Sequence, residues 1–262
     1  MGTHSYNNTV IDIHSHVLPG VDDGARTIED SIQMLRIAAA AGTTEIVATP
    51  HANAQFVFQK ENIEQVFGEL RESSSEFIQV HLGCDFHLDY DNVLDAISDP
   101  AKYTINHGRY LMLEPPDYCS SQIMQQALKR LIEVNIVPII THPERMNFLQ
   151  TKFHELERLI DDGCLIQVTG QSFLGRFGPA AKASADSLLE RGLVHVVASD
   201  AHDCVDRPPD LSPSYKYVAS GYGPELADEL FVHNPGAVVR NKFISPAEKR
   251  PSEKPRSFAF WK

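Results

Sequence analysis

The sequence predicts one domain with a parallel α/β fold, and three observations support this. Short β-rich runs alternate with segments of helical periodicity along most of the chain. The length of 262 residues suits an α/β barrel, since such barrels routinely reach this size as one unit. Hydrophobic residues make up 42% of the chain and charged residues 22%, which is ordinary for a globular protein with a sizeable core.

The domain is expected to span residues 10–244. Residues 1–9 are interpreted as a flexible N-terminal extension. The segment 245–262 is rich in proline, serine and charged residues, a composition that favours a surface extension over a packed element.

Seven segments have the composition of buried strands. They are residues 10–13, 45–49, 78–83, 110–114, 137–141, 164–168 and 194–199. Between the first two, Thr27 can cap a helix with Asp30 three residues later, and Gly42 can end it. The apolar stripe of that helix is Ile28, Ile32, Leu35 and Ala39. Later stripes predict three more core-facing helices, with Ile63, Val66, Phe67 and Leu70, then Met124, Ala127, Leu128 and Leu131, then Phe153, Leu156, Leu159 and Ile160.

Charge and composition exclude several functional classes. The formal net charge of −12 argues against a nucleic-acid binder, because phosphate backbones are held by clustered Lys and Arg. Neither a signal peptide nor an apolar run of membrane-spanning length is recognisable, so a cytoplasmic protein without membrane insertion is expected. The four cysteines, Cys84, Cys119, Cys164 and Cys204, are far apart and are interpreted as buried free thiols.

Metal-ligand residue types follow nearly every predicted strand. His14 and His16 follow the first strand and, one residue apart in an extended segment, point to the same side. Single imidazoles follow three other strands, as His51, His142 and His202. Each of these alone is more often a structural polar residue, but in α/β barrels the carboxyl ends of the strands meet at one face.

Carboxylates occupy the remaining strand ends. Asp85 follows the third strand, Glu114 ends the fourth and Asp200 follows the seventh, while Asp22 and Asp23 lie in the first loop. An isolated Asp-Asp-Gly is usually only a turn. A mixed set of imidazoles and carboxylates without thiolates suits Mn, Fe or Zn better than a structural zinc site built from cysteines.

The order of motifs resembles one known family. The motifs that carry this similarity are, in order, DIHSHVLPGVDDGA, ATPHAN, GCDFHLD, THPER, GRFG and SDAH followed by RPP. Through them the chain is similar, between residues 10 and 240, to the polymerase-and-histidinol-phosphatase (PHP) family. Within it they resemble the manganese-dependent bacterial protein-tyrosine phosphatases of capsule and exopolysaccharide synthesis. The resemblance implies a distorted (β/α)7 TIM-like barrel, the PHP fold, which agrees with the seven predicted strands.

The resemblance also implies three divalent cations, with manganese expected and iron or zinc as alternatives. One ion is assigned to His14, His16, Asp85 and Asp200, a second to Asp85, Glu114 and His142, and a third to Asp23, His51 and His202. Asp22 is the alternative to Asp23. The position of Asp85 is normally glutamate, so its shorter side chain is expected to alter the spacing or affinity of the first two ions.

Arg145, Arg207 and Asp200 are the catalytic residues that the resemblance implies, with the arginines holding the phosphoryl group through paired N–H donors. A cysteine-based phosphatase needs an arginine six residues after the thiol, but Tyr90, Gln125, Gly170 and Asp210 occupy those positions. The expected substrate is a phosphotyrosine-bearing protein, specifically a tyrosine kinase of polysaccharide export. The alternatives are a small-molecule phosphatase, such as a histidinol-phosphate phosphatase, and a catalytically weak phosphoprotein-binding protein.

Overall fold

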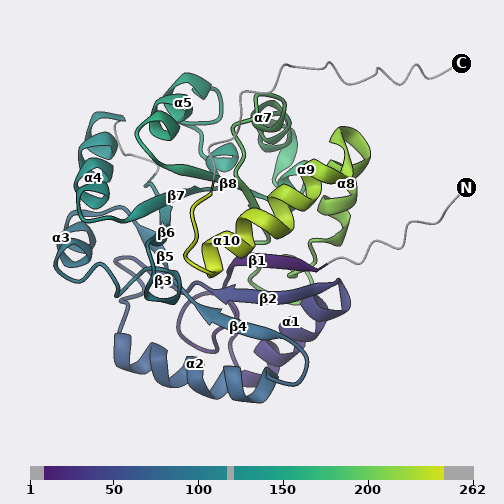
Figure 1. Cartoon of the computed structure of the whole chain (residues 1–262). Helices are drawn as coiled ribbons and strands as arrows, with labels where there is room; N and C mark the ends of the chain where they lie inside the picture. Colours follow the sequence, from purple (N-terminus) through teal and green to yellow (C-terminus); the bar gives the residue numbers. More distant parts are fainter. Residues whose placement is uncertain (1–8, 117–120, 245–262) are drawn as a thin grey trace, which may run out of the picture.

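A computed structural model of the chain describes residues 9–116 and 121–244, with the helices arranged around the strands (Figure 1). The strands are β1 (Val10–Ser15), β2 (Thr43–Ala48), β3 (His51–Ala52), β4 (Gln79–Leu82), β5 (Asp85–His87), β6 (Tyr110–Glu114), β7 (Val137–Thr141), β8 (Leu165–Thr169) and β9 (Val196–Ala198). All seven predicted segments contain strands. The predicted extensions lie outside the described residues, apart from residue 9.

The strands form two parallel sheets, ordered β1-β2-β4 and β3-β5-β6-β7-β8-β9. The first and last strands approach each other at an isolated parallel bridge between Ser15 and Ala201. There His16 N donates to the Ala201 carbonyl at 2.8 Å, and Asp200 N donates to the His14 carbonyl at 2.8 Å. The predicted parallel α/β fold is thereby confirmed, and at this seam a single bridge, not a continuous ladder, joins the two sheets.

Two strands are each followed, after a short break, by a further short strand. β3 continues the direction of β2 beyond Pro50, and β5 continues β4 beyond Gly83. Proline has no N–H for a ladder, and a Cβ on Gly83 would lie 2.8 Å from Cγ1 of Ile105, so the backbone passes its neighbours closely there. The predicted strands 45–49 and 78–83 are present as β2 and β4, whereas the short strands β3 and β5 were not predicted. After the breaks, His51 and Asp85 pair in register, which brings two candidate ligands side by side.

The helices cover the outside of the strands. They are α1 (Ile28–Ala40), α2 (Lys60–Ser74), α3 (Tyr90–Ser98), η1 (Ile105–His107), α4 (Ser121–Glu133), η2 (Pro143–Arg145), α5 (Phe153–Asp161), α6 (Gly170–Phe173), α7 (Gly178–Glu190), α8 (Ser212–Tyr222), α9 (Pro224–Asp228), η3 (Glu229–His233) and α10 (Asn234–Val239). The four helices predicted from their apolar stripes are all present, as α1, α2, α4 and α5.

Helix α1 begins as predicted, because the Thr27 hydroxyl accepts a hydrogen bond from Asp30 N at 3.2 Å. Its buried face is rotated from the predicted stripe, however: Met34 and Ala38 are fully buried, whereas Ile32 is only partly buried. Ile32 lies at the edge of the helix, where it lines an open cavity with Ser73 of α2. In α2, α4 and α5 every predicted stripe residue is buried or packed against the core.

The inside of the barrel has its own apolar cluster, which includes Tyr110, Met112, Ile139 and Val196. Tyr110 and Met112 alternate along β6, and the next alternate residue is Glu114. Because side chains alternate between the two faces of a strand, Glu114 is directed into the carboxyl end of the same interior. The apolar filling thus supports a polar site above it.

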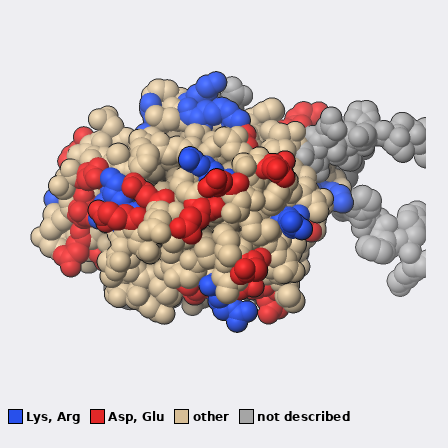
Figure 2. Space-filling view, turned by 90° about the horizontal axis from the view of Figure 1, so that it is seen from below, with Lys and Arg blue, Asp and Glu red and all other residues tan. Residues whose placement is uncertain are grey.

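The surface agrees with the expectation from charge. On the face shown in Figure 2, acidic side chains form a band across the middle, with basic side chains scattered among and around them. This differs from the continuous basic surface that a phosphate backbone requires. Within the described residues, none of the helices is long and apolar enough to span a bilayer.

The cysteine prediction is confirmed for Cys84 and Cys164, which are free and buried. It was wrong for Cys204, which is free but only partly buried because it lies in the loop after β9. Cys119 lies outside the described residues.

His195, at the start of β9, provides a pH test of stability. Burial lowers the pKa of its imidazole from 6.5 to about 4, and its Nδ1 accepts a hydrogen bond from Ile166 N at 3.2 Å. Below pH 6.5 the unfolded chain takes up a proton that the folded chain refuses, so stability falls as the pH approaches 4. Between pH 7.5 and 5, we expect the wild type to lose about 2 kcal/mol more unfolding free energy than His195→Asn. Urea unfolding of both proteins checks this, and equal losses would contradict it.

Candidate metal centre

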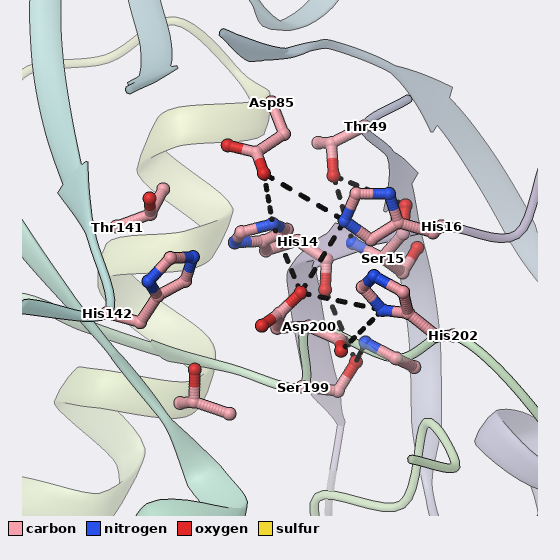
Figure 3. A network of polar contacts seen from close by, with 12 residues as sticks. His14, Ser15, His16, Thr49, Asp85, Thr141, His142, Ser199, Asp200 and His202 are labelled. Carbon is pink, nitrogen blue, oxygen red and sulfur yellow. Dashed lines mark hydrogen bonds and ion pairs between the residues drawn. The ribbon is translucent and has the colours of Figure 1, made fainter. Parts of the chain in front are cut away.

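Six strand ends bring their polar side chains to one place, part of which Figure 3 shows. The residues are His14 and His16 from β1, His51 from β3, Asp85 from β5, Glu114 from β6, His142 from the end of β7, and Asp200 and His202 after β9. Asp23 joins them from the loop that follows β1. Every candidate ligand predicted from the sequence therefore lies in this cluster.

The first group consists of His14, His16, Asp85 and Asp200. The Nε2 atoms of His14 and His16 each lie 3.5 Å from Oδ1 of Asp200. The same nitrogen atoms lie 3.5 and 4.0 Å from Oδ2 of Asp85. Ligand atoms that are each about 2.1 Å from one ion lie roughly 3 to 3.5 Å from one another, so only small movements would close this group around a cation.

The second group is centred on Glu114. Its Oε1 atom lies 3.7 Å from Nε2 of His142. Ligand atoms of His51, Asp85 and Glu114 also lie within 4.8 Å of one another. Asp85 thus belongs to both groups, as the resemblance implies. His51 is nearer to the second group than expected, because its Nδ1 lies 3.2 Å from Asp85 Oδ2.

The third group contains Asp23, His51 and His202, and His16 is close enough to join it. Oδ1 of Asp23 lies 3.4 Å from Nε2 of His51 and 3.5 Å from Nε2 of His202. Its neighbour Asp22 faces a different partner, because Asp22 Oδ2 lies 2.7 Å from Nδ1 of His16. Of the two aspartates, Asp23 is therefore the one whose carboxylate points among the imidazoles.

Hydrogen bonds behind the cluster fix which imidazole nitrogen faces it. Nδ1 of His14 contacts the Gln167 side-chain oxygen at 3.1 Å, and Nδ1 of His202 contacts the Asp200 carbonyl at 3.0 Å. These oxygens only accept, so each Nδ1 carries the hydrogen and each Nε2 presents its lone pair to the cluster. His16 is held in the same way by Asp22.

Buried polar atoms without partners show that the residues fit a metal. Nε2 of His14, Nε2 of His16 and Oδ1 of Asp85 are buried and have no hydrogen-bond partner. Buried polar atoms are nearly always paired, and the two imidazole nitrogens converge on the same oxygens of Asp85 and Asp200 with the lone-pair chemistry of metal ligands. The donor set therefore suits a divalent cation.

The carboxylates give the cluster a field that favours positive charge. Burial works to lower the pKa of His51, but its contacts with Asp23 and Asp85 outweigh burial and raise it to about 11. His16 behaves alike, since contacts with Asp200 and Asp22 outweigh burial and raise its pKa to about 9. A field that attracts protons to imidazoles also attracts metal ions, which displace those protons when they bind.

Two candidate ligands have an unusual backbone. His142 has φ 35° and Asp200 has φ 52°, in the left-handed region that residues other than glycine seldom adopt. Such strain persists only where the surrounding structure holds it, and it is typical of functional sites. The two residues end β7 and follow β9, at the same face of the barrel.

The two predicted arginines meet at Asp200. Nη1 of Arg145 pairs with Asp200 Oδ2, and Nη2 of Arg207 lies 2.6 Å from the same oxygen. The other oxygen of Asp200 faces His14 and His16. Asp200 therefore joins the histidine cluster to a pair of guanidinium groups.

Sequence analysis missed two residues that support the site. Gln167 interrupts the apolar strand β8, and this polar residue among Ile166 and Val168 was the available signal. Glu144 is the second of these residues. It is fully buried, accepts hydrogen bonds from Thr169 N and the Ser172 hydroxyl at 3.1 and 2.6 Å, and so anchors the loop of His142 and Arg145.

Asp22 offers a test of the outer hydrogen bonds. Asp22→Asn keeps the shape but removes the charge that orients His16, so we expect metal affinity to fall 10- to 100-fold, roughly the usual effect of losing such a partner. Metal titration of the stripped protein measures this. Asp30→Asn, which alters a partly exposed aspartate paired with Arg26, is the matched control and should bind like the wild type.

Comparison with known proteins identifies the family. A family model described as capsular polysaccharide synthesis, CpsB/CapC, matches residues 10–240. The chain belongs to this family. CpsB/CapC relatives include the tyrosine-protein phosphatase CpsB of Streptococcus pneumoniae, which is 32% identical over 90% of this chain and 100% of its own length. The tyrosine-protein phosphatase YwqE of Bacillus subtilis is 30% identical, over 96% of this chain and 100% of its own.

Solved structures agree with the CpsB/CapC assignment. One of them superposes on this chain with a TM-score of 0.84. It comes from crystal structures of YwqE of Bacillus subtilis and CpsB of Streptococcus pneumoniae, which are described as unique metal-dependent tyrosine phosphatases. It is 29% identical and covers 92% of this chain and 99% of its own. The histidinol phosphatase hisK of Listeria monocytogenes shares the fold alone. It is 12% identical, has a TM-score of 0.52, and the match covers 75% of this chain and 96% of its own.

Proposed function

We propose that this CpsB/CapC protein is a metal-dependent phosphatase that hydrolyses phosphotyrosine in proteins. The convergence of an imidazole–carboxylate cluster and two arginines on Asp200 carries the proposal, because phosphate monoesters need both cations and directed donors to neutralise the phosphoryl oxygens. The names of relatives such as CpsB and YwqE support the choice of phosphotyrosine.

The cluster would hold three cations, and manganese is the proposed metal. The sets are His14, His16, Asp85 and Asp200, then Asp85, Glu114 and His142, then Asp23, His51 and His202. Bound there, divalent cations would polarise the phosphoryl oxygens and activate water for in-line attack. Asp85 reaches the first two sets despite its short side chain, since its Oδ2 lies 3.5 Å from His14 Nε2 and its carboxylate lies within 4.8 Å of that of Glu114.

Arg145 and Arg207 would grip the phosphoryl oxygens that the cations leave free. Both side chains are about one-quarter exposed, so they lie at the mouth of the site and can meet a substrate from solvent. Arg207 is further held by Nη2, which donates to the Asp200 carbonyl at 2.9 Å. Asp200 orients both guanidinium groups while its other oxygen belongs to the metal cluster.

The proposed physiological substrate is a cytoplasmic tyrosine kinase of polysaccharide export. This extends the family description, capsular polysaccharide synthesis, to a specific partner. Co-expression of such a kinase with the wild-type protein or with Arg145→Ala, followed by phosphotyrosine blotting, would test it. Dephosphorylation by the wild type alone supports the partner, and equal phosphorylation in both contradicts it.

The activity is tested by removing the metal and adding back Mn, Fe, Co, Zn or Mg separately. Turnover is then compared on a phosphotyrosine peptide, a phosphoserine peptide and histidinol phosphate, with His51→Ala as the inactive control. Phosphotyrosine-selective turnover restored by manganese is expected. Preference for histidinol phosphate would overturn the substrate class, and phosphopeptide binding without turnover would indicate a binding protein.

A further inference from the structure

The aromatic ring of Phe177, in the GRFG motif, lies against both arginines of the proposed site. Cζ of Arg145 lies 4.3 Å from the centroid of this ring, and Cζ of Arg207 lies 5.8 Å from it. We infer that Phe177 is a positioning residue, which holds the two guanidinium groups in the orientation that binds phosphate. This inference rests on the proposed function, because it assigns these arginines to a phosphoryl group.

Two glycines with positive φ flank the segment that carries the Phe177 ring. Gly175 and Gly178, on either side of the Arg176–Phe177 pair, have φ values of +81° and +88°, which side-chain-bearing residues rarely adopt. Arg176 Nη2 also lies 2.7 Å from Asp206 Oδ1. Because Asp206 directly precedes Arg207, this contact ties the GRFG loop to the loop that carries the second arginine.

Phe177 does not serve as core filling. It is only partly buried and belongs to neither apolar core cluster of the described residues. The ring lies against two guanidinium groups, so its position serves these cations more than the interior. This distinguishes it from Phe173, four residues earlier, which is fully buried.

Electrostatics explains why the arginines need the ring. Both guanidinium groups contact the same oxygen of Asp200, so they repel each other across one carboxylate. The face of an aromatic ring carries partial negative charge and attracts guanidinium groups without forming hydrogen bonds to them. The ring therefore restrains both groups while leaving N–H donors for phosphate, which a second carboxylate would occupy.

The test measures the affinity of inorganic phosphate for the manganese-loaded full chain by calorimetry, so it does not depend on turnover. Phe177→Leu keeps apolar bulk but removes the ring, and we expect phosphate to bind on the order of tenfold more weakly. Phe177→Tyr retains the ring face and should bind phosphate within about twofold of the wild type. Should Phe177→Leu fold poorly, Phe177→Met provides the same comparison.

A double-mutant cycle separates positioning from general structural damage. If Phe177 acts through the arginines, Phe177→Leu should weaken phosphate binding much less in an Arg145→Ala, Arg207→Ala background than in the wild type. Unchanged affinity in Phe177→Leu, or an equal loss in both backgrounds, overturns the inference. A wild type that binds phosphate through Phe177 but hydrolyses no phosphotyrosine peptide would overturn the proposed function and leave the inference standing.

Discussion

Asp85→Asn is expected to lower kcat/KM for a phosphotyrosine peptide by about 10³-fold, equivalent to about 4 kcal/mol of transition-state stabilisation. The substitution preserves shape but removes the charge shared by two ligand groups. Oδ2 of Asp85 lies 3.5 Å from His14 Nε2 and 3.2 Å from His51 Nδ1, so its loss affects both groups together. Metal content should fall with activity.

Two measurements check this result, namely steady-state kinetics at saturating manganese and elemental analysis of the bound metal. Asp95→Asn is the matched control, because Asp95 is a carboxylate on α3 that accepts hydrogen bonds from Lys102 Nζ and the Tyr103 hydroxyl, each at 2.6 Å. It should retain both activity and metal. Full metal content and wild-type kinetics in Asp85→Asn would show that this aspartate does not bridge two ions.

Much of the site was predictable because barrel topology turns sequence position into spatial position. Ligands that follow different strands meet at one face whenever the strands run parallel, so a rough assignment of strands is sufficient. His14 and Asp200 are 186 positions apart in the sequence, yet Nε2 of one lies 3.5 Å from Oδ1 of the other. Errors of one or two residues at strand ends do not disturb this rule.

The missed features depend on packing between segments distant in the sequence. The short strand β5 was not predicted; it follows the point where Gly83 passes Ile105, and apolar periodicity contains no information about that approach. The buried face of α1 is likewise set by its contact with α2, which shields Ile32 only in part. Local patterns identify elements, whereas their neighbours decide how each element is turned.

Residues that support ligands were harder to predict than the ligands. Gln167 and Glu144 act through a single hydrogen-bond acceptor each, and glutamine or glutamate at such a place has no distinctive spacing. Phe177 could be noticed only as part of the GRFG motif, since an isolated phenylalanine normally indicates core packing. Its contact with Arg145 and Arg207 depends on the tertiary structure, which brings distant segments together.

Loss of the arginines should separate binding of phosphate from binding of metal. We expect Arg145→Ala and Arg207→Ala each to lower kcat/KM by about 10²- to 10³-fold, in the range found for removing a directed donor from a transition state. Metal content should be unchanged, because the arginines contact Asp200 through Oδ2 while Oδ1 faces His14 and His16.

Arg145→Lys should recover little activity, since an ammonium group retains the charge but lacks the planar pair of donors that matches two phosphoryl oxygens. Arg71→Ala is the control, because Arg71 also stacks on a ring, that of Phe67 at 5.3 Å, but on α2. Steady-state kinetics and elemental analysis of the bound metal measure the activity and the metal content of each variant. If Arg145→Lys is as active as the wild type, positive charge alone is required. If Arg145→Ala loses metal, the arginine serves to hold Asp200 in the metal cluster.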